Sequence, residues 1–206
     1  MKNIIKYIAG VLVLFLPFGE FTTVNAQPVP ENPGFKSLVV DQAGIFSLEQ
    51  TQDLELKVAS EYFMDENFLE LFKKESLLTL KNNYVLVEMS YLNAPIQLYD
   101  ILFELQLKGY QPVLAHPERY NFYHNNFKEY EKLKKAGCLF QMNLLSSVGY
   151  YGKDVSIAAD KLLSKGLIDF VGSDIHHENH IKSFENKIII KNKDAFEKAI
   201  SANVFF

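Results

Sequence analysis

Carboxylate and imidazole side chains stand where apolar runs of β-strand length end in this sequence. Glu88 ends one such run, His116 follows a second, and Asp174 and His176 follow another. Asp174 and His176 are two positions apart, so in an extended chain their side chains point to the same side. Glu61 stands near the start of the same region. Carboxylates together with imidazoles suit Mn, Fe or Zn, and carboxylate-rich positions also suit Mg.

Taken singly, each of these residues has a plainer interpretation. A lone glutamate such as Glu61 is usually a solvated helix residue, Glu88 can be a surface carboxylate at a strand end, and His116 before a proline can simply fix a turn. The other three histidines are interpreted as surface loop residues: His124, His177 and His180. An acid or imidazole at the same end of three successive predicted strands favours the metal site.

A regular alternation of strand and helix patterns after Val58 would position these residues. Runs of strand length occur at Tyr84–Met89, Pro112–Ala115, Cys138–Met142 and Ile168–Gly172. Helical patterns lie between them at about Ile96–Lys108, Phe127–Lys135 and Val155–Lys165. Gly109, Gly137 and Gly166 each follow a helical pattern, where a left-handed C-terminal cap is expected. This order predicts an α/β fold with parallel strands, whose carboxyl ends gather functional residues.

The composition is that of a globular protein. The 206 residues are 48% apolar and 22% charged, which fits one or two domains and not a disordered chain. The formal net charge is −4 and the pI is about 5.8. The basic residues are spread as lysine pairs over helical patterns, which is typical of a solvated face. Nucleic acid is therefore not an expected partner, because nothing in this pattern attracts a phosphate backbone.

The single cysteine is not a convincing nucleophile. Phosphatases that use a thiol place an arginine six positions after the cysteine, and here Leu144 occupies the position six residues after Cys138. Cys138 also lies in an apolar run with Leu139 and Phe140. We interpret Cys138 as a buried structural residue. A lone cysteine also gives no evidence of an oxidising compartment, because no disulfide can form within the chain.

The N-terminus has the pattern of a secretory signal peptide over residues 1–26. Lys2 and Lys6 form a basic region, and residues 8–18 form an apolar run too short to span a bilayer. Residues 24–26, Val-Asn-Ala, offer a cleavage site before Gln27. The alternative interpretation is a buried apolar helix. We exclude this segment from the predicted fold.

Residues 27–57 form a separate segment in the pattern. Three prolines within residues 27–35 predict an extended linker. Ser47 and Gln50 have the spacing of a capping box, which would start a helix over residues 48–57. The sequence Val40-Asp41-Gln42-Ala43-Gly44-Ile45-Phe46-Ser47 before that helix resembles the opening of a TPM domain, a small module of exported or membrane-anchored bacterial proteins.

Several segments after Val58 resemble consecutive landmarks of one enzyme family. They are Ala59–Asp65, Tyr84–Glu88, Gly109–Tyr120, Gly137–Asn143 and Gly172–His176. Their order and spacing are similar to those of the bacterial protein-tyrosine phosphatases of the PHP superfamily, which are encoded in capsule and exopolysaccharide loci. The resemblance implies a distorted (β/α) barrel with metal ions at the carboxyl ends of its strands. It also implies a tyrosine-phosphorylated partner, the tyrosine-rich tail of a kinase that regulates polysaccharide synthesis.

The resemblance assigns roles to individual residues. It implies a metal-bridging role for Glu61, and it implies that Arg119 holds the substrate phosphate, for which a planar guanidinium is suited. The further metal ligands that it implies are Glu88, His116, Asp174 and His176. The implied reaction is hydrolysis of phosphotyrosine by metal-activated water, with Mn as the expected metal and Fe, Zn or Mg as alternatives.

The chain departs from the family at its N-terminal side. Members of the family begin with a His-x-His metal motif, whereas this sequence has no histidine before His116. We therefore expect residues 58–206 to form the C-terminal part of a phosphatase domain, an incomplete barrel with weak or no activity. The signal peptide implies export, whereas enzymes of this family are cytoplasmic. Two alternatives remain: an exported TPM-type interaction module with an inert C-terminal part, and another PHP-type phosphomonoesterase.

Overall fold

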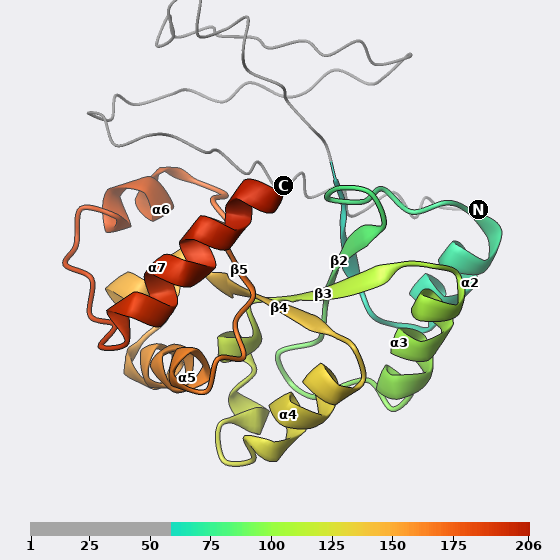
Figure 1. Ribbon diagram of the computed structural model, residues 1–206, viewed down its shortest axis with the longest axis horizontal. Helices are drawn as coiled ribbons and strands as arrows, with labels where there is room; N and C mark the ends of the chain where they lie inside the picture. The colour runs from blue at the N-terminus through green and yellow to red at the C-terminus, as the bar shows by residue number, and fades with distance from the viewer. Residues whose placement is uncertain (1–58) are drawn as a thin grey trace, which may run out of the picture.

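A five-stranded parallel sheet forms the centre of the computed structural model, which describes residues 59–206 (Figure 1). The strands follow one another in sequence order, and every neighbouring pair is parallel. The strands are β1 Glu61–Phe63, β2 Tyr84–Glu88, β3 Gln111–Ala115, β4 Leu139–Asn143 and β5 Phe170–Gly172. The prediction of an α/β fold with parallel strands is confirmed. The predicted signal peptide, linker and TPM-like helix lie outside the described residues.

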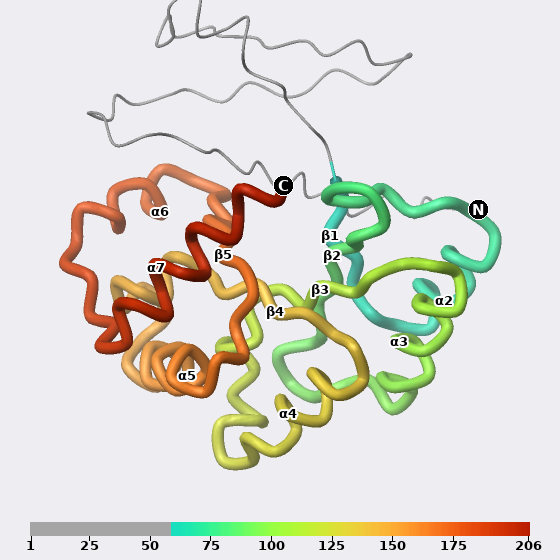
Figure 2. The backbone as a smooth tube through the Cα atoms, in the orientation of Figure 1, coloured from blue at the N-terminus to red at the C-terminus, as the bar shows by residue number. Residues whose placement is uncertain are grey.

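The helices follow one another around the sheet in the order of the strands that they connect (Figure 2). The α-helices are α2 Glu66–Lys74, α3 Leu98–Leu107, α4 Lys128–Lys135, α5 Lys153–Ser164, α6 Glu178–Ser183 and α7 Lys193–Ala202. Four 3₁₀ turns complete the chain: η1 Pro117–Arg119, η2 Asn121–Tyr123, η3 Leu144–Val148 and η4 Asn203–Phe205. The predicted helices correspond to α3, α4 and α5. Over residues 59–206, none of the helices has the length and apolar character that a membrane crossing needs.

Glycines end the three helices that the sequence predicted. Gly109, Gly137 and Gly166 have φ values of +85°, +81° and +64°, in the left-handed region that residues with a Cβ rarely adopt. The fit is tightest at Gly137, where an added Cβ would lie 2.9 Å from Oε1 of Gln106. The predicted C-terminal caps are therefore confirmed, and each cap turns the chain back toward the next strand.

Helix α2 was not predicted, although its sequence carries the signals for it. Asp65 caps its N-terminus, because Oδ1 of Asp65 accepts a hydrogen bond from the backbone N–H of Phe68 at 2.8 Å. Phe68 and Phe72, one turn apart, are buried against the sheet. The cap and this pair direct the chain from β1 back toward β2.

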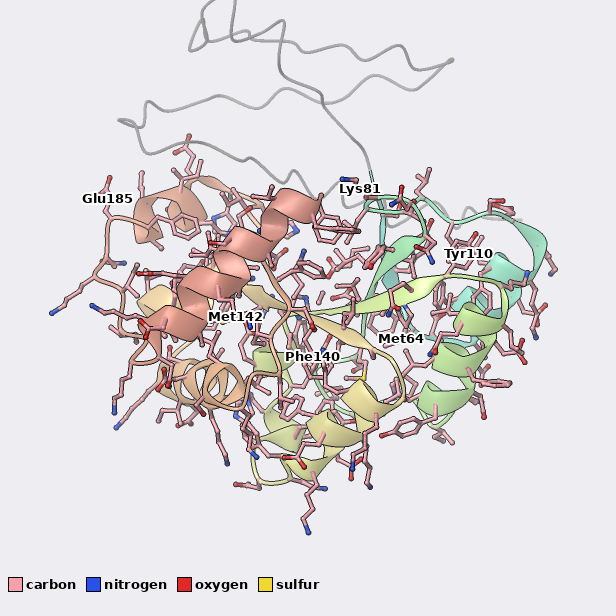
Figure 3. All side chains as sticks on the ribbon, viewed as in Figure 1. Met64, Lys81, Tyr110, Phe140, Met142 and Glu185 are labelled. Atoms are coloured by element: carbon pink, nitrogen blue, oxygen red, sulfur yellow. The ribbon has the colours of Figure 1, made fainter. Side chains whose placement is uncertain are left out.

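The two faces of the sheet have different surroundings. Along β2, Val85 and Val87 point into the main core beneath the helices, whereas Leu86 points to the opposite face. Phe140 on β4 lies in the same main core (Figure 3). On the opposite face Leu86 packs with residues of β3 and β5. Glu88 lies on that face too, since it is two positions after Leu86, and this alternation brings its carboxylate to the site described below.

Candidate metal and phosphate site

Three of the predicted metal ligands meet at the carboxyl ends of β2 and β3, beside the first residue of β1. Glu61 comes from β1, Glu88 ends β2, and His116 follows β3. Nε2 of His116 lies 3.3 Å from Oε1 of Glu61 and 3.5 Å from Oε2 of Glu88. One ligand atom from each residue lies within 4.8 Å of the others, so we call these three residues the metal-ligand cluster.

An unusual backbone conformation at His116 turns its imidazole into the cluster. His116 has a φ of +36°, which is uncommon for a residue with a side chain and needs support from its surroundings. Its backbone N–H donates to the carbonyl of Gln141 at 2.7 Å. The hydroxyl of Tyr120 accepts from the N–H of Met89 and donates to the carbonyl of Ala115, which ties the ends of β2 and β3 together. These contacts fix the turn that carries the imidazole.

The electrostatics of the cluster favour a cation between the two carboxylates. His116 is 3% exposed, and burial alone would lower its pKa. Hydrogen bonds to Glu61 and Glu88 outweigh burial and raise the pKa of His116 to about 9. This raised pKa favours a protonated ring beside the two carboxylates at neutral pH. Two carboxylates with one imidazole are also a donor set that divalent ions accept, and such an ion would take the place of the proton.

Asp174 and Asn143 form a second wall of the site. Asp174 follows β5 with a φ of +48°, and its Oδ2 accepts hydrogen bonds from Nη1 of Arg119 at 3.0 Å and Nδ2 of Asn143 at 2.9 Å. Asp174 and Asn143 line a cavity of about 10 Å³ together with Glu61 and His116. The cavity thus places Glu61 and His116 of the metal-ligand cluster beside Asp174, the ion-pair partner of Arg119.

Arg119 is the only arginine in the sequence, and it lies between two aromatic rings. Its Cζ atom is 4.7 Å from the ring centre of Tyr91 and 4.1 Å from the ring centre of Tyr151. The side chain is 19% exposed. A guanidinium with its plane fixed in this way can present a bidentate edge to a phosphate.

Comparison with known proteins places this chain in a family. The family model described as "Capsular polysaccharide synthesis, CpsB/CapC" matches residues 41–201. The chain belongs to the CpsB/CapC family. Its sequence is 35% identical to the tyrosine-protein phosphatase YwqE of Bacillus subtilis (strain 168) over 105 residues, which are 50% of this chain and 41% of YwqE. It is 30% identical to the tyrosine-protein phosphatase CpsB of Streptococcus pneumoniae over 135 residues, which are 63% of this chain and 56% of CpsB.

A solved structure supports the same assignment. The fold matches a chain from the crystal structures of YwqE from Bacillus subtilis and CpsB from Streptococcus pneumoniae, which are described as unique metal-dependent tyrosine phosphatases. The TM-score is 0.57 at 30% identity, over 63% of this chain and 55% of that chain. This CpsB/CapC chain spans about half the length of the curated relatives that it matches.

The remaining predicted ligand of this CpsB/CapC chain, His176, lies apart from the cluster. Its side chain is 49% exposed, and its Nδ1 lies 2.8 Å from the carbonyl oxygen and 3.3 Å from Oδ1 of Asp174. The structure thus brings Glu61, Glu88 and His116 together and pairs Asp174 with His176 beside them. The ligand roles of all five residues stay predictions.

The interpretation of His180 as a surface loop residue is wrong. His180 lies in α6 and is 7% exposed, and its Nδ1 accepts a hydrogen bond from the backbone N–H of His176 at 3.2 Å. Burial, followed by the charge of the neighbouring His177, lowers the pKa of His180. His180 therefore supports the loop that carries Asp174 and His176.

Four residues of the site were missed by the sequence interpretation. Asn143 ends β4, so the rule that identified Glu88 and His116 also points to it. Glu118 follows His116 by two positions and is fully buried; its Oε1 accepts from the N–H of Asn143 at 2.9 Å and from Oγ of Ser146 at 2.7 Å. The other two are Tyr91 and Tyr151. Their loops give no periodic signal, so only the folded chain reveals them.

Cys138 has no place in the chemistry of this site. The thiol is 1% exposed and lies in the main core beneath the helices. Burial raises its pKa to about 12, so the thiolate that a nucleophile needs is scarce at neutral pH. The interpretation of Cys138 as a buried structural residue is confirmed.

Proposed function

We propose that this chain is a metal-dependent protein-tyrosine phosphatase. One observation carries the proposal: Glu61 and His116 of the metal-ligand cluster line the same cavity as Asp174, and Asp174 is paired with the only arginine, Arg119. A phosphate monoester needs both parts, because cations must neutralise its charge and orient it for displacement. The names of the relatives YwqE and CpsB support the choice of tyrosine phosphate as the substrate class.

The metal-ligand cluster would hold a divalent ion, for which we propose manganese. The proposed further ligands are Asp174, which lines the same cavity, and His176, whose Nδ1 lies 2.8 Å from the carbonyl oxygen of Asp174. When bound, such an ion supplies positive charge for the phosphoryl oxygens and makes water a nucleophile at neutral pH. His116 must give up its proton for this, so proton release accompanies metal binding.

Arg119 would bind the phosphate of the substrate. Its Nη1 is occupied by Asp174, so its remaining N–H donors are those that face an incoming anion. Asn143 holds the other side of Asp174 and thereby keeps the ion pair in place. The guanidinium thus acts as an oriented anion site and not as a mobile surface charge.

The partner that we propose is a tyrosine-phosphorylated protein, and specifically the tyrosine-rich tail of a kinase that regulates polysaccharide synthesis. The family description, capsular polysaccharide synthesis, supports this context. We propose further that residues 58–206 carry the activity, after a signal peptide at 1–26 and a linker with the start of a TPM-like domain at 27–57.

Metal-dependent turnover of a phosphotyrosine peptide tests the proposal. The purified chain should release phosphate from phosphotyrosine in Mn²⁺, but slowly, because the His-x-His motif of the family is missing, and EDTA should abolish the reaction. His116→Ala and Glu61→Gln should each lower the rate by roughly a hundredfold or more, since a displaced metal loses its geometry. Cys138→Ala is the control and should retain the wild-type rate. Absence of turnover, or turnover that survives EDTA, would refute the proposed activity.

A further inference from the structure

The guanidinium of Arg119 is held by three neighbours from three separate loops. Tyr91 comes from the loop after β2, Tyr151 from the loop before α5, and Asp174 from the loop after β5. The centres of both rings lie close to the same cation, at 4.7 Å and 4.1 Å from its Cζ, and the carboxylate accepts a hydrogen bond from its Nη1. Since a cation over an aromatic face is attracted by the negative face of the ring, each ring adds to the hold on Arg119.

Tyr91 is fixed from the side of the metal-ligand cluster. Its ring stacks on His116 with ring centres 5.6 Å apart and on Tyr120 with ring centres 6.0 Å apart, at interplanar angles of 28° and 30°. Its hydroxyl lies 3.4 Å from Nε2 of His116. The residue is nevertheless 45% exposed, so it forms the rim of the site and not part of the core.

Tyr151 is held by a separate loop that contains two glycines. Gly149 and Gly152 flank the loop with φ values of +82° and +94°. The hydroxyl of Tyr151 accepts a hydrogen bond from Nδ2 of Asn143 at 3.2 Å, and the same amide group donates to Asp174. The ring and the carboxylate that hold Arg119 are thus positioned by one asparagine.

We propose that Tyr91 and Tyr151 are positioning residues that clamp Arg119 for phosphate binding, and we call the pair the tyrosine clamp. The rings fix the plane of the guanidinium, and Asp174 fixes its rotation within that plane. The free N–H groups then stay directed at an anion beside the metal-ligand cluster. The clamp rests on the proposed function only in taking a phosphate as the ligand, and it has its own tests.

Because Arg119 is the only arginine, its side chain can be observed alone. In protein labelled with [¹⁵N]arginine, a single Nε–H resonance is expected in the NMR spectrum. Stacked ring faces shift this proton upfield, so Tyr151→Leu and Tyr91→Leu should move it downfield. Tyr151→Phe and Tyr91→Phe retain the ring and should leave it near the wild-type position. Leucine keeps the apolar bulk, so the fold should survive the change.

Affinity for inorganic phosphate in Mn²⁺, measured by calorimetry, reports on the clamp's function. Each leucine variant should bind phosphate about three- to tenfold more weakly, and each phenylalanine variant within about twofold of wild type. Tyr99→Ala removes a similarly exposed ring from α3 and should change nothing. The comparison of Tyr151→Leu with Tyr151→Phe is decisive. Among the described residues, the ring and hydroxyl of Tyr151 contact Arg119, Asn143 and Tyr150 but not the metal-ligand cluster, so its replacement leaves that cluster intact.

The outcomes separate the clamp from the proposed enzyme. If the leucine variants lose phosphate affinity while wild type shows no turnover, the clamp stands and the phosphatase proposal falls. If Tyr151→Leu keeps both the wild-type Arg119 resonance and the wild-type phosphate affinity, the clamp is overturned whether or not the chain is an enzyme. A wild-type Arg119 resonance that does not respond to phosphate also overturns it.

Discussion

At the scale of single residues, the site combines charged side chains near strand ends with aromatic and amide side chains that hold them. Glu88 and His116 were predictable because parallel strands bring their carboxyl ends to one edge. Tyr91 and Tyr151 were not predictable, because both lie in loops. Loop sequences carry no periodic pattern from which their contact with Arg119 could be inferred. Asn143 also lies at the end of a strand, but its side chain is an uncharged amide and was therefore not predicted as a ligand. The polar support of a site is therefore harder to predict than its ligands.

Replacing Arg119 tests the role of the guanidinium itself. Arg119→Lys keeps the charge but loses the planar fork, so one charge-assisted hydrogen bond to phosphate is lost. Such a bond contributes about 1.5–3 kcal/mol, which corresponds to roughly a ten- to hundredfold loss in kcat/KM. Steady-state kinetics on a phosphotyrosine peptide in Mn²⁺ measures the effect. An unchanged kcat/KM would reduce Arg119 to a structural partner of Asp174.

The buried thiol of Cys138 gives a prediction that depends on pH. Its pKa is raised to about 12 in the folded chain, so the folded state keeps its proton where an unfolded thiol releases it. Folding stability therefore falls as pH rises through the interval between the unfolded thiol's pKa and 12. At pH 8, iodoacetamide should leave Cys138 unmodified in the native protein and modify it fully in urea, as mass spectrometry would record. Rapid alkylation of the native protein would contradict this burial.

At the scale of elements, glycine positions predicted helix ends more reliably than periodicity predicted helices. The helices before Gly109, Gly137 and Gly166 were all found, with ends within two residues of those observed at their C-termini. Helix α2 was missed although the sequence carries its signals, the Asp65 cap and the aromatic pair Phe68 and Phe72. Helices α6 and α7 were also missed. They follow the last predicted strand, and the sequence interpretation placed helices only between two strands.

Two of these glycines allow a matched test of how a helix ends. Both Gly137 and Gly109 have left-handed backbones, but only at Gly137 would an added Cβ contact another side chain, Oε1 of Gln106 at 2.9 Å. Gly109→Ala should cost about 1 kcal/mol of unfolding free energy from backbone strain alone. Gly137→Ala should cost more, about 2 kcal/mol, because Gln106 must also move. Urea unfolding measures both, and an equal loss would show that Gln106 yields freely.

At the scale of the whole molecule, the described residues form an open sheet with an edge at each side. Over residues 59–206, β1 pairs only with β2 and β5 pairs only with β4. An exposed edge of a parallel sheet invites pairing with another chain unless something covers it. The sequence predicted parallel strands, but it did not predict what covers the free edge of β5. A side chain and not another strand covers this edge, and it comes from a residue more than thirty positions later in the chain.

That cover is Asn203, in the turn η4. Its side chain is 7% exposed, and its amide makes both bonds that a neighbouring strand would make to Val171. Oδ1 of Asn203 accepts from the N–H of Val171 at 3.0 Å, and Nδ2 donates to the carbonyl of Val171 at 2.7 Å. The aromatic residues beside it close the same end of the sheet: Phe206 contacts Phe170 with ring centres 4.7 Å apart. One side chain thus completes the edge of β5.

Asn203→Ala should therefore destabilise the whole molecule and not only its C-terminal turn. The change leaves the N–H and the carbonyl of Val171 buried without partners, at about 1–3 kcal/mol for each group. The free energy of unfolding in urea should fall by about 2–4 kcal/mol. The stability of Asn203→Asp should lie between those of the wild type and Asn203→Ala, because a carboxylate can still accept from the N–H but cannot donate to the carbonyl.

Asn186→Ala, at an exposed position, is the control and should change stability by less than about 0.5 kcal/mol. With the edge uncovered, the alanine variant should also self-associate at lower protein concentration in light scattering. If Asn203→Ala unfolds at the same urea concentration as Asn186→Ala, water satisfies Val171 and the edge of β5 needs no cover.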